Sequence, residues 1–282
     1  YWPAEDVNKE VFPWLKVNSR NQFFLMVHYM DPHDPYFFRP LNNKSFARIR
    51  NPEPRPSLAN RLATAYAQEV KYLDKNLAKL FEFLKQNDLY ENTMIIFISD
   101  HGEEFFEHNG WWHGTSLFEE QIHVPMIIKF PKGKSKGKIH NGVVQLLDIP
   151  PTVLDEIGLP RSEKMQGRSR SGAELEVAAS EGALSELNLE GHVMSSYRES
   201  RWKWIEANPS NPRGLPPKSL FDLKSDPEEQ KNLLPGSQIY KEKIRRKLKQ
   251  ILKEAKSGST QRETVSRDPA TEERLKALGY ID

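Results

Sequence analysis

The residues best suited to chemistry in this sequence are an acidic and an imidazole side chain placed directly after an apolar run. Residues 93–99 form a continuous β-type run, and Asp100, His101 and Gly102 follow it. Asp offers a hard anionic oxygen and His a borderline nitrogen, so the pair can bind one divalent cation if the backbone turns sharply, as glycine permits. The pair predicts half of a metal site. The alternative is that Asp100 caps a following helix.

Two further imidazoles are expected close to this pair in space. His113 lies downstream in a Trp- and Gly-containing segment, and His33 follows an earlier apolar run at residues 23–29. The carboxyl ends of neighbouring parallel strands meet at one edge of a sheet. If both runs are such strands, His33 and the 100–113 segment lie at the same edge and form a cationic, metal-bearing pocket.

Other titratable side chains near the pair have ordinary structural interpretations. Glu103, Glu104 and Glu107 are expected on a helix that begins there, where carboxylates complement the positive end of the helix dipole, with metal binding as the alternative. His108 is expected in an exposed turn, with orientation of a metal ligand as the alternative. The other histidines are interpreted as structural: His28, His123, His140 and His192.

The elements that must position these residues alternate between strand and helix. Apolar runs of strand length occur at residues 23–29, 93–99 and 124–130. Apolar residues at three- and four-residue spacing predict an amphipathic helix over 62–84, and a second helix is expected over 144–157. Strand, helix and strand in this order form a βαβ unit, which is typical of a parallel sheet covered on both faces.

The sequence pattern changes beyond residue 170. Residues 167–183 are rich in Ser, Gly, Ala and Glu, as in a crossing between subdomains. Short strands are then predicted at residues 192–197, 201–205 and 219–223, followed by a helix over about 239–255. We therefore expect an α/β domain over residues 1–170 and a subdomain over 171–282, made of a small antiparallel sheet, one helix and a tail.

Composition narrows the class of protein. The 282 residues can bury a sizeable core, and 41 Lys and Arg against 39 Asp and Glu give no charge of one sign to recruit nucleic acid. The absence of cysteine excludes disulfides, thiolate nucleophiles and cysteine-based zinc sites, leaving His and carboxylates as metal ligands. No apolar run approaches the length of a membrane span. We expect neither a nucleic-acid partner nor a membrane span.

Five segments in a fixed order resemble the sulfatase family of the alkaline phosphatase superfamily. They are Tyr29–Tyr36; Ser99–Glu103; His113–Glu120 with Val124-Pro125; Leu146–Thr152; and Leu220–Leu223 with Asp226-Pro227 and Asn232-Leu233. The resemblance covers nearly the whole chain. It implies an α/β fold like that of alkaline phosphatase, with a mixed, mostly parallel sheet flanked by helices, and it implies hydrolysis of sulfate esters.

The resemblance also implies roles for individual residues. Asp100 and His101 match the later pair of metal ligands, the metal being Ca2+ in most sulfatases, with Mn2+, Zn2+ and Mg2+ as alternatives. His33 and His113 match residues that contact the anionic oxygens of the ester and donate hydrogen bonds to developing charge. The alternatives are a loop residue wedged between prolines for His33 and a ring packed on two tryptophans for His113.

The nucleophile motif of the family is absent from the sequence. Sulfatases use a formylglycine made from Cys or Ser in a Cys/Ser-x-Pro-x-Arg motif, and the nearest string, residues 210–213, has the wrong spacing. The first metal-binding aspartates of the family are absent too. The chain is therefore expected to be inactive without a missing N-terminal part, whether it is a fragment or half of a processed protein. A missing part also predicts exposed apolar surface.

Three interpretations of function remain after the sequence analysis. The first is a metal-dependent hydrolase acting on a sulfated small molecule or glycan. The second is a phosphodiester or phosphonate monoester hydrolase, or a phosphoethanolamine transferase, which use Asp-His-Gly metal ligands as well. The third is a non-catalytic binding domain that keeps the fold. The sequence upstream of Tyr1 would discriminate between the two enzymes.

An extracytoplasmic location is expected, meaning periplasmic, secreted or lysosomal. Many sulfatases work outside the cytoplasm, and Asn43-Lys44-Ser45 forms a glycosylation sequon. Both points are indirect, because the sequon matters only on a eukaryotic secretory route.

Overall fold

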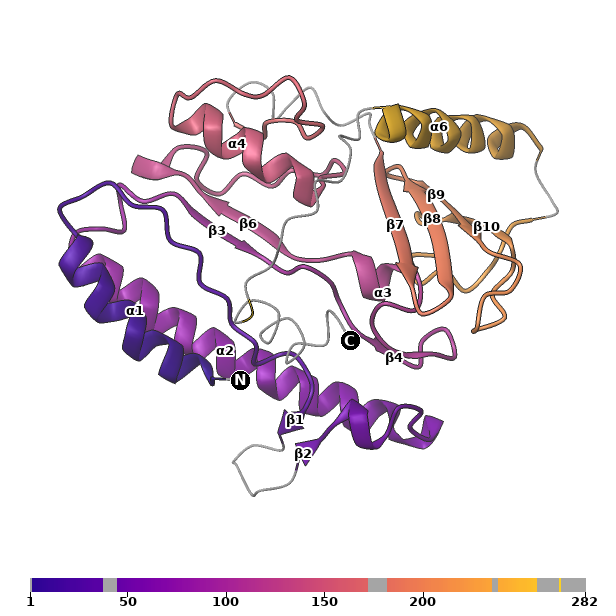
Figure 1. Cartoon of the computed structure of the whole chain (residues 1–282), viewed down its shortest axis with the longest axis horizontal. Coiled ribbons are helices and arrows are strands. Elements are labelled where there is room, and N and C mark those ends of the chain that lie inside the picture. The colour runs from indigo at the N-terminus through magenta and orange to yellow at the C-terminus, as the bar shows by residue number, and fades with distance from the viewer. Residues whose placement is uncertain (1, 38–44, 172–181, 235–237, 258–268, 270–282) are drawn as a thin grey trace.

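The computed structural model describes residues 2–37, 45–171, 182–234, 238–257 and 269 (Figure 1). The helices are α1 (Ala4–Asn18), α2 (Ala59–Gln86), α3 (Glu119–Ile122), α4 (Ile149–Glu156) and α6 (Gln238–Ser257). Single-turn helices are η1 (Arg48–Arg50), η2 (Pro56–Leu58), η3 (Pro131–Gly133) and η4 (Leu146–Asp148). No helix in the described part of the chain is both long and apolar enough to cross a membrane.

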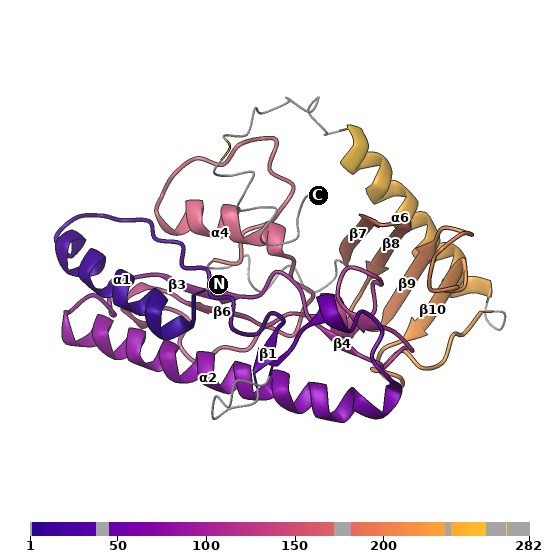
Figure 2. The same cartoon turned by 60° about the horizontal axis from the view of Figure 1, so that its bottom comes forward.

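The predicted amphipathic helix over 62–84 is confirmed as α2. Its apolar positions, among them Leu62, Ala65 and Leu84, are buried. Helix α1, which the sequence did not predict, packs beside it, and the Asn8 side-chain amide donates to the carbonyl oxygen of Asn76 (2.9 Å). The two helices lie along one side of the molecule in Figures 1 and 2.

The strands near the centre of the molecule pair antiparallel. Strand β3 (Ile95–Ile98) pairs with β6 (Met126–Lys129), and the β4–β5 hairpin (Glu104–Phe105 and Trp111–Trp112) lies between them in the chain. A smaller pair joins β1 (Tyr36–Phe37) to β2 (Ser45–Phe46). The runs predicted at 93–99 and 124–130 are therefore strands, but every strand pairing in the described residues is antiparallel. The mostly parallel sheet is not seen in this part of the fold.

The expected strand at 23–29 is not a strand in the structure. Its side chains alternate as in a strand, because Phe23, Leu25 and Val27 pack against α1 and α2 while Phe24 (84% exposed) and Met26 (77%) point outward. No strand of the described residues forms a ladder with it, so the alternation occurs without hydrogen-bonded pairing. An apolar face is left exposed.

The C-terminal region forms the predicted antiparallel sheet with one helix. The strands β7 (Ala183–Leu189), β8 (His192–Arg198), β9 (Trp202–Ala207) and β10 (Lys218–Asp222) lie in the order β10-β9-β8-β7. Helix α6 covers one face, where Trp204 meets Ile244 and Leu248. The sheet and helix begin beyond residues 172–181, which lie outside the described residues, so the predicted boundary at 170/171 stays a prediction.

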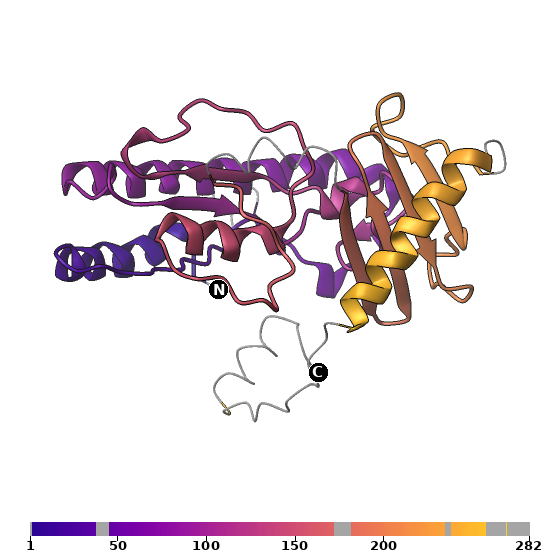
Figure 3. The same cartoon turned by 90° about the horizontal axis from the view of Figure 1, so that it is seen from above.

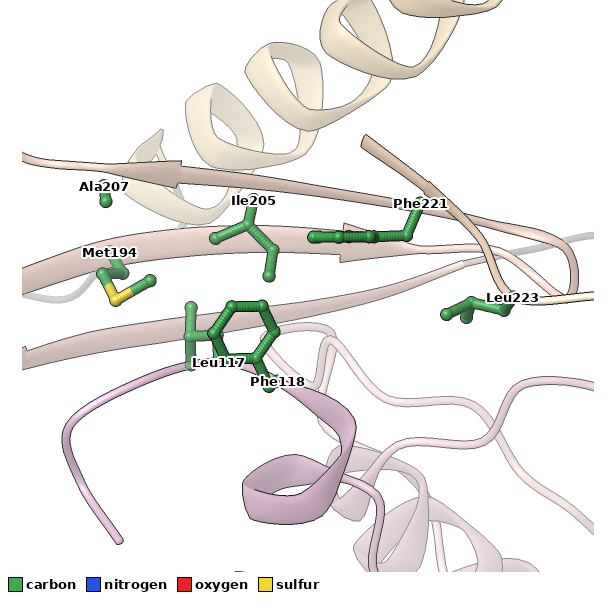
Figure 4. Close-up of a cluster of buried hydrophobic side chains, with 7 residues drawn as sticks. All are labelled: Leu117, Phe118, Met194, Ile205, Ala207, Phe221 and Leu223. Carbon is green, nitrogen blue, oxygen red and sulfur yellow. The ribbon is translucent and has the colours of Figure 1, made fainter. Parts of the chain in front are cut away.

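The other face of this sheet packs against the chain just before α3. Leu117 and Phe118 insert between Met194, Ile205 and Phe221, as Figure 4 shows. Successive residues of a strand point to opposite faces, so this region has two cores, one under α6 and one toward α3. The second core joins the C-terminal subdomain to the segment that carries the candidate site.

Candidate active site

The structure brings three imidazoles together beyond the end of β3. The rings of His101 and His113 stack with their centroids 3.9 Å apart, and the His33 ring lies 5.3 Å from that of His113. His33 lies in the turn that follows residues 23–29, which we call the extended segment. Its backbone N–H donates to the Met30 carbonyl oxygen (3.0 Å). The predicted gathering of His33 with the 100–113 segment is therefore present, although no parallel strands produce it.

Asp100 and His101 present side-chain atoms to the same region. The Asp100 Oδ1 atom accepts from the His101 backbone N–H (3.0 Å), and Asp100 Oδ2 lies 3.7 Å from His101 Nε2. Burial alone would raise the pKa of Asp100, but the nearby His101 and backbone N–H groups outweigh it and lower the pKa. No helix follows Asp100, so the helix-cap interpretation is wrong.

The geometry of this pair is compatible with half of a metal site. Hard cations such as Ca2+ hold ligand oxygens at about 2.3–2.6 Å, so two ligands at a right angle are roughly 3.5 Å apart, close to the separation of Oδ2 and Nε2. His101 Nδ1 faces the Gly102 carbonyl oxygen (2.9 Å), so Nε2 is the ring nitrogen that a cation could contact. No group of three or more metal-binding side chains occurs among the described residues. Further ligands are needed.

The orientation of the His113 ring is fixed by Glu103, which is itself bound by Tyr36. Its Nδ1 lies 3.0 Å from Glu103 Oε1, and the Tyr36 hydroxyl donates a short hydrogen bond to Glu103 Oε2. Tyr36 is fully buried, and burial together with the charge of Glu103 raises the pKa of its hydroxyl, so the phenol stays a donor. A carboxylate that accepts from Nδ1 leaves Nε2 of His113 to face the site.

His33 is held by its neighbour and is more exposed than His113. Its Nδ1 lies 2.8 Å from the Asp34 carbonyl oxygen, and Asp34 Oδ2 accepts from the Arg48 backbone N–H (2.9 Å). The imidazole is 29% exposed, against 18% for His113. The contacts of His33 and Asp34 fix the turn in which the imidazole lies.

Glu103 and Glu104 are not on a helix, contrary to the expectation from the sequence. Both are buried, with Glu104 fully enclosed at the start of β4, and Glu107 lies in the turn that follows. Short acidic runs after a glycine favour a helix start in general, but here each carboxylate has a specific buried donor. The roles of Tyr36 and Glu103 in holding His113 were not predicted from the sequence. The only signal was their position inside the segments that resemble the family.

Glu104 is the centre of a buried hydrogen-bond network. Its carboxylate accepts from the backbone N–H groups of His108 (3.2 Å) and Gly110 (2.9 Å) and from the Gln121 side chain (2.7 Å). Arg213 donates to both oxygens, at 2.6 and 2.8 Å. Arg213 belongs to the string that only superficially resembled a nucleophile motif, and the structure gives it a different role. It joins the C-terminal subdomain to the β4–β5 hairpin.

His108 is also buried more deeply than expected. Its Nδ1 lies 2.7 Å from Glu120 Oε1, its Nε2 lies 3.2 Å from the Glu229 carbonyl oxygen, and its ring stacks on Phe118. Burial lowers the pKa of His108, but the hydrogen bond and charge of Glu120 outweigh it and the pKa is raised. His108 lies in a turn as predicted, but the predicted exposure is wrong, since the side chain is 10% exposed.

A buried ion group fixes α3 to the C-terminal sheet. The Lys203 amine is fully buried and lies 2.9 Å from carboxylate oxygens of both Glu119 and Glu229. Burial raises the pKa of Glu119, but Lys203 and Arg198 outweigh it and lower the pKa, whereas burial dominates at Glu229 and raises its pKa. Trp204 and Lys203 face opposite sides of β9: Trp204 packs under α6, and Lys203 reaches Glu119 on α3.

Comparison with known proteins gives a consistent picture. A family model described as Sulfatase matches residues 4–159. Arylsulfatase K of Canis lupus familiaris is 35% identical over 171 residues, covering 57% of this chain and 31% of the relative. An endo-4-O-sulfatase of Bacteroides thetaiotaomicron is 29% identical over 269 residues, covering 84% of this chain and 52% of the relative.

A solved structure from work on glycosaminoglycan metabolism by Bacteroides thetaiotaomicron shares the fold. It superimposes with a TM-score of 0.72 at 24% identity and covers 98% of this chain and 61% of its own. The likeness supports an alkaline-phosphatase-like fold. The chain spans 31–52% of the length of the first curated relatives that it matches.

Proposed function

Since the chain belongs to the sulfatase family, we propose that it forms part of an enzyme that hydrolyses sulfate esters. The observation that carries this proposal is the stacked His101–His113 pair with His33 and Asp100 beside it. Such a cluster offers hydrogen-bond donors to the three anionic oxygens of a sulfate ester and half of a cation site. The non-catalytic alternative gives no reason for this gathering.

In this proposal His113 and His33 bind the ester's oxygens through their ring N–H groups. Glu103 and Tyr36 keep His113 in one orientation, so that little reorganisation is needed as negative charge grows on those oxygens. Asp100 and His101 would hold a divalent cation, Ca2+ first, with Mn2+, Zn2+ or Mg2+ as alternatives. When bound, such a cation neutralises charge on the ester. The nucleophile is proposed to come from sequence outside this chain.

The second part of the proposal is a partner, the N-terminal portion of the same enzyme. Large apolar side chains are exposed on two segments of the described residues. They are Phe24 and Met26 in residues 23–29 and Ile127 on β6 (62% exposed). Monomeric proteins rarely leave large apolar patches exposed. Analytical ultracentrifugation of this chain alone is expected to show self-association. A clean monomer with cooperative unfolding would contradict this part.

The substrate class that we propose is a sulfated glycan, in an extracytoplasmic compartment. The 4-O-sulfatase relative and the structure from glycosaminoglycan metabolism support this choice. The sequon Asn43-Lys44-Ser45 begins outside the described residues.

The test is turnover of an aryl sulfate by the complete enzyme. Asp100→Asn is expected to lower turnover by at least ~10²-fold, because charge stabilisation in the site is lost. Asp88→Asn is a matched control, since Asp88 is exposed and its positive φ of 56° suits Asn. Unchanged turnover in Asp100→Asn would remove Asp100 from the site. Faster turnover of a phosphonate monoester than of a sulfate would favour the phosphoryl alternative.

A further inference from the structure

The outward face of α6 carries a row of cations. Lys243, Arg246, Lys249 and Lys253 are exposed and follow each other at spacings of three or four residues. With 3.6 residues per turn and a rise of 1.5 Å per residue, the row lies on one side of the helix and extends over about 15 Å. Figure 3 shows this helix running along the outside of the C-terminal sheet.

The opposite face of α6 is already occupied. Ile244 and Leu248 are fully buried against the sheet, where they meet Trp204 and Leu220. A helix that lies in a membrane interface inserts its apolar face between lipids. Here that face is not free, so the row of cations is a purely polar surface. A soluble polyanion fits it better than a bilayer.

The row also differs from the other cations of the same helix. Arg245 lies near Glu206 (4.0 Å) and Glu242 (3.9 Å), and Lys247 forms a short ion pair with Glu199. Within the described part of the chain, none of the four cations of the row forms an ion pair with a carboxylate within 4.0 Å. Like charges at three- and four-residue spacing repel each other along a helix. A bound anion would relieve this repulsion.

We propose that this row, Lys243, Arg246, Lys249 and Lys253, is a docking surface for a sulfated polysaccharide. Sulfate groups stay ionised at every working pH and repeat along a linear chain, which matches cations spread along a helix better than a single pocket would. The row of cations is observed in the structure, whereas the choice of a sulfated polymer rests on the proposed function. The surface is distinct from the candidate active site.

The row lies across the C-terminal sheet from the segment that carries the candidate site. The C-terminal sheet lies between α6 and the segment before α3, because its other face packs on Leu117 and Phe118. A polymer held on α6 is therefore separated from the segment that carries the site by at least the helix and the sheet, on the order of two layers of about 10 Å each. Tethering raises the effective concentration of its remaining esters at the site.

The test is the binding of a fluorescently labelled heparin oligosaccharide to the whole chain, measured by fluorescence polarisation. The variant Arg246→Gln, Lys249→Gln, Lys253→Gln is expected to bind at least about tenfold more weakly. The matched control removes three exposed lysines from α2, as Lys71→Gln, Lys75→Gln, Lys85→Gln. It is expected to change the affinity by no more than about twofold. Circular dichroism checks that both variants are folded.

Several results would overturn the proposal. Equal weakening in the α6 and α2 variants would mean that only the overall charge matters, and an unchanged α6 variant would remove the surface. Tighter binding to single-stranded DNA or to phosphatidylserine vesicles than to heparin would assign the row to another partner. Hyaluronan, which carries carboxylates without sulfates, is expected to bind more weakly than heparin, and equal binding would contradict recognition of sulfate.

The test also separates this proposal from the proposed function. In the complete enzyme, the α6 variant is expected to turn over a small aryl sulfate at the unaltered rate, because such a substrate does not reach the row. If the enzyme had no sulfatase activity, turnover would be absent while heparin binding by the row and its loss in the variant could still be measured.

Discussion

Two residues of the candidate active site, His113 and Asp100, are supported very differently by their neighbours. His113 is 18% exposed, and a carboxylate and a buried phenol fix it from behind. Asp100, on the same segment, is 60% exposed at its side chain and accepts from the backbone N–H of the next residue. The difference indicates that this chain fixes the orientation of His113, the proposed hydrogen-bond donor, by itself. Asp100, a proposed metal ligand, is left more open.

The largest effect is expected from removing Glu104, the centre of the hydrogen-bond network next to Glu103 and His113. Glu104→Ala leaves the Arg213 guanidinium without its buried partner and is expected to lower the free energy of unfolding by about 3–5 kcal/mol. Urea denaturation measures this loss. Glu104→Gln keeps the shape and should cost less. A loss below about 1 kcal/mol in Glu104→Ala would show that the hairpin does not depend on the network.

A smaller effect is expected one residue earlier. Glu103→Ala leaves the buried Tyr36 hydroxyl and His113 Nδ1 without their acceptor and should lower the free energy of unfolding by about 1–3 kcal/mol. Glu103→Gln, which retains an acceptor oxygen, should restore part of it. In 15N spectra of the imidazole nitrogens, the His113 signals should shift in Glu103→Ala, and unchanged signals would contradict its orienting role.

The third prediction concerns pH. The pKa of His108 in the folded state is raised above its ordinary value of 6.5 because the Glu120 carboxylate outweighs the effect of burial. The stability that this ion pair contributes is therefore full below pH 6.5 and is lost as pH rises through the raised pKa. The difference in unfolding free energy between the original chain and His108→Gln should shrink by about 1 kcal/mol between pH 6 and pH 9. A difference that grows with pH would contradict the assignment.

The smallest effect is expected at Asp100, the more exposed residue of the comparison. Asp100→Ala should change the free energy of unfolding by no more than about 0.5 kcal/mol, as for ordinary surface substitutions. The same urea experiment measures it, with Asp88→Ala as an exposed control. A loss as large as that of Glu103→Ala would show that both residues are supported alike and would remove the comparison.

The local elements could be predicted from the sequence, and their long-range partners could not. Apolar spacing was enough for α2, for β3 and for β8, β9, β10 and α6 of the C-terminal subdomain, because burial of one face imposes a period on the sequence. The first strand of that sheet, β7, was not predicted. The direction in which β3 and β6 pair depends on neighbours far away in the chain. The missing ladder at residues 23–29 depends on them as well.

The candidate site shows the same limit. Asp100, His101, His33 and His113 could be named because their side-chain chemistry is distinctive and they follow apolar runs. Glu103 and Glu104 look like ordinary exposed acids in the sequence, and only the fold reveals that Tyr36 and Arg213 bury them. A carboxylate gains its role from a donor that lies distant in sequence, and composition does not encode that pairing.

The contact between Glu104 and Arg213 also sets an order of events during synthesis. The two residues are separated by 109 positions in the chain. Chains emerge from the ribosome at about 5–20 residues per second, so the hairpin waits on the order of ten seconds for its partner. Until then the Glu104 carboxylate has the backbone N–H groups of His108 and Gly110 and the Gln121 side chain as donors, but no counterion. The network beneath the site is therefore completed late, and a chain that stops before residue 213 would lack the guanidinium that pairs with Glu104.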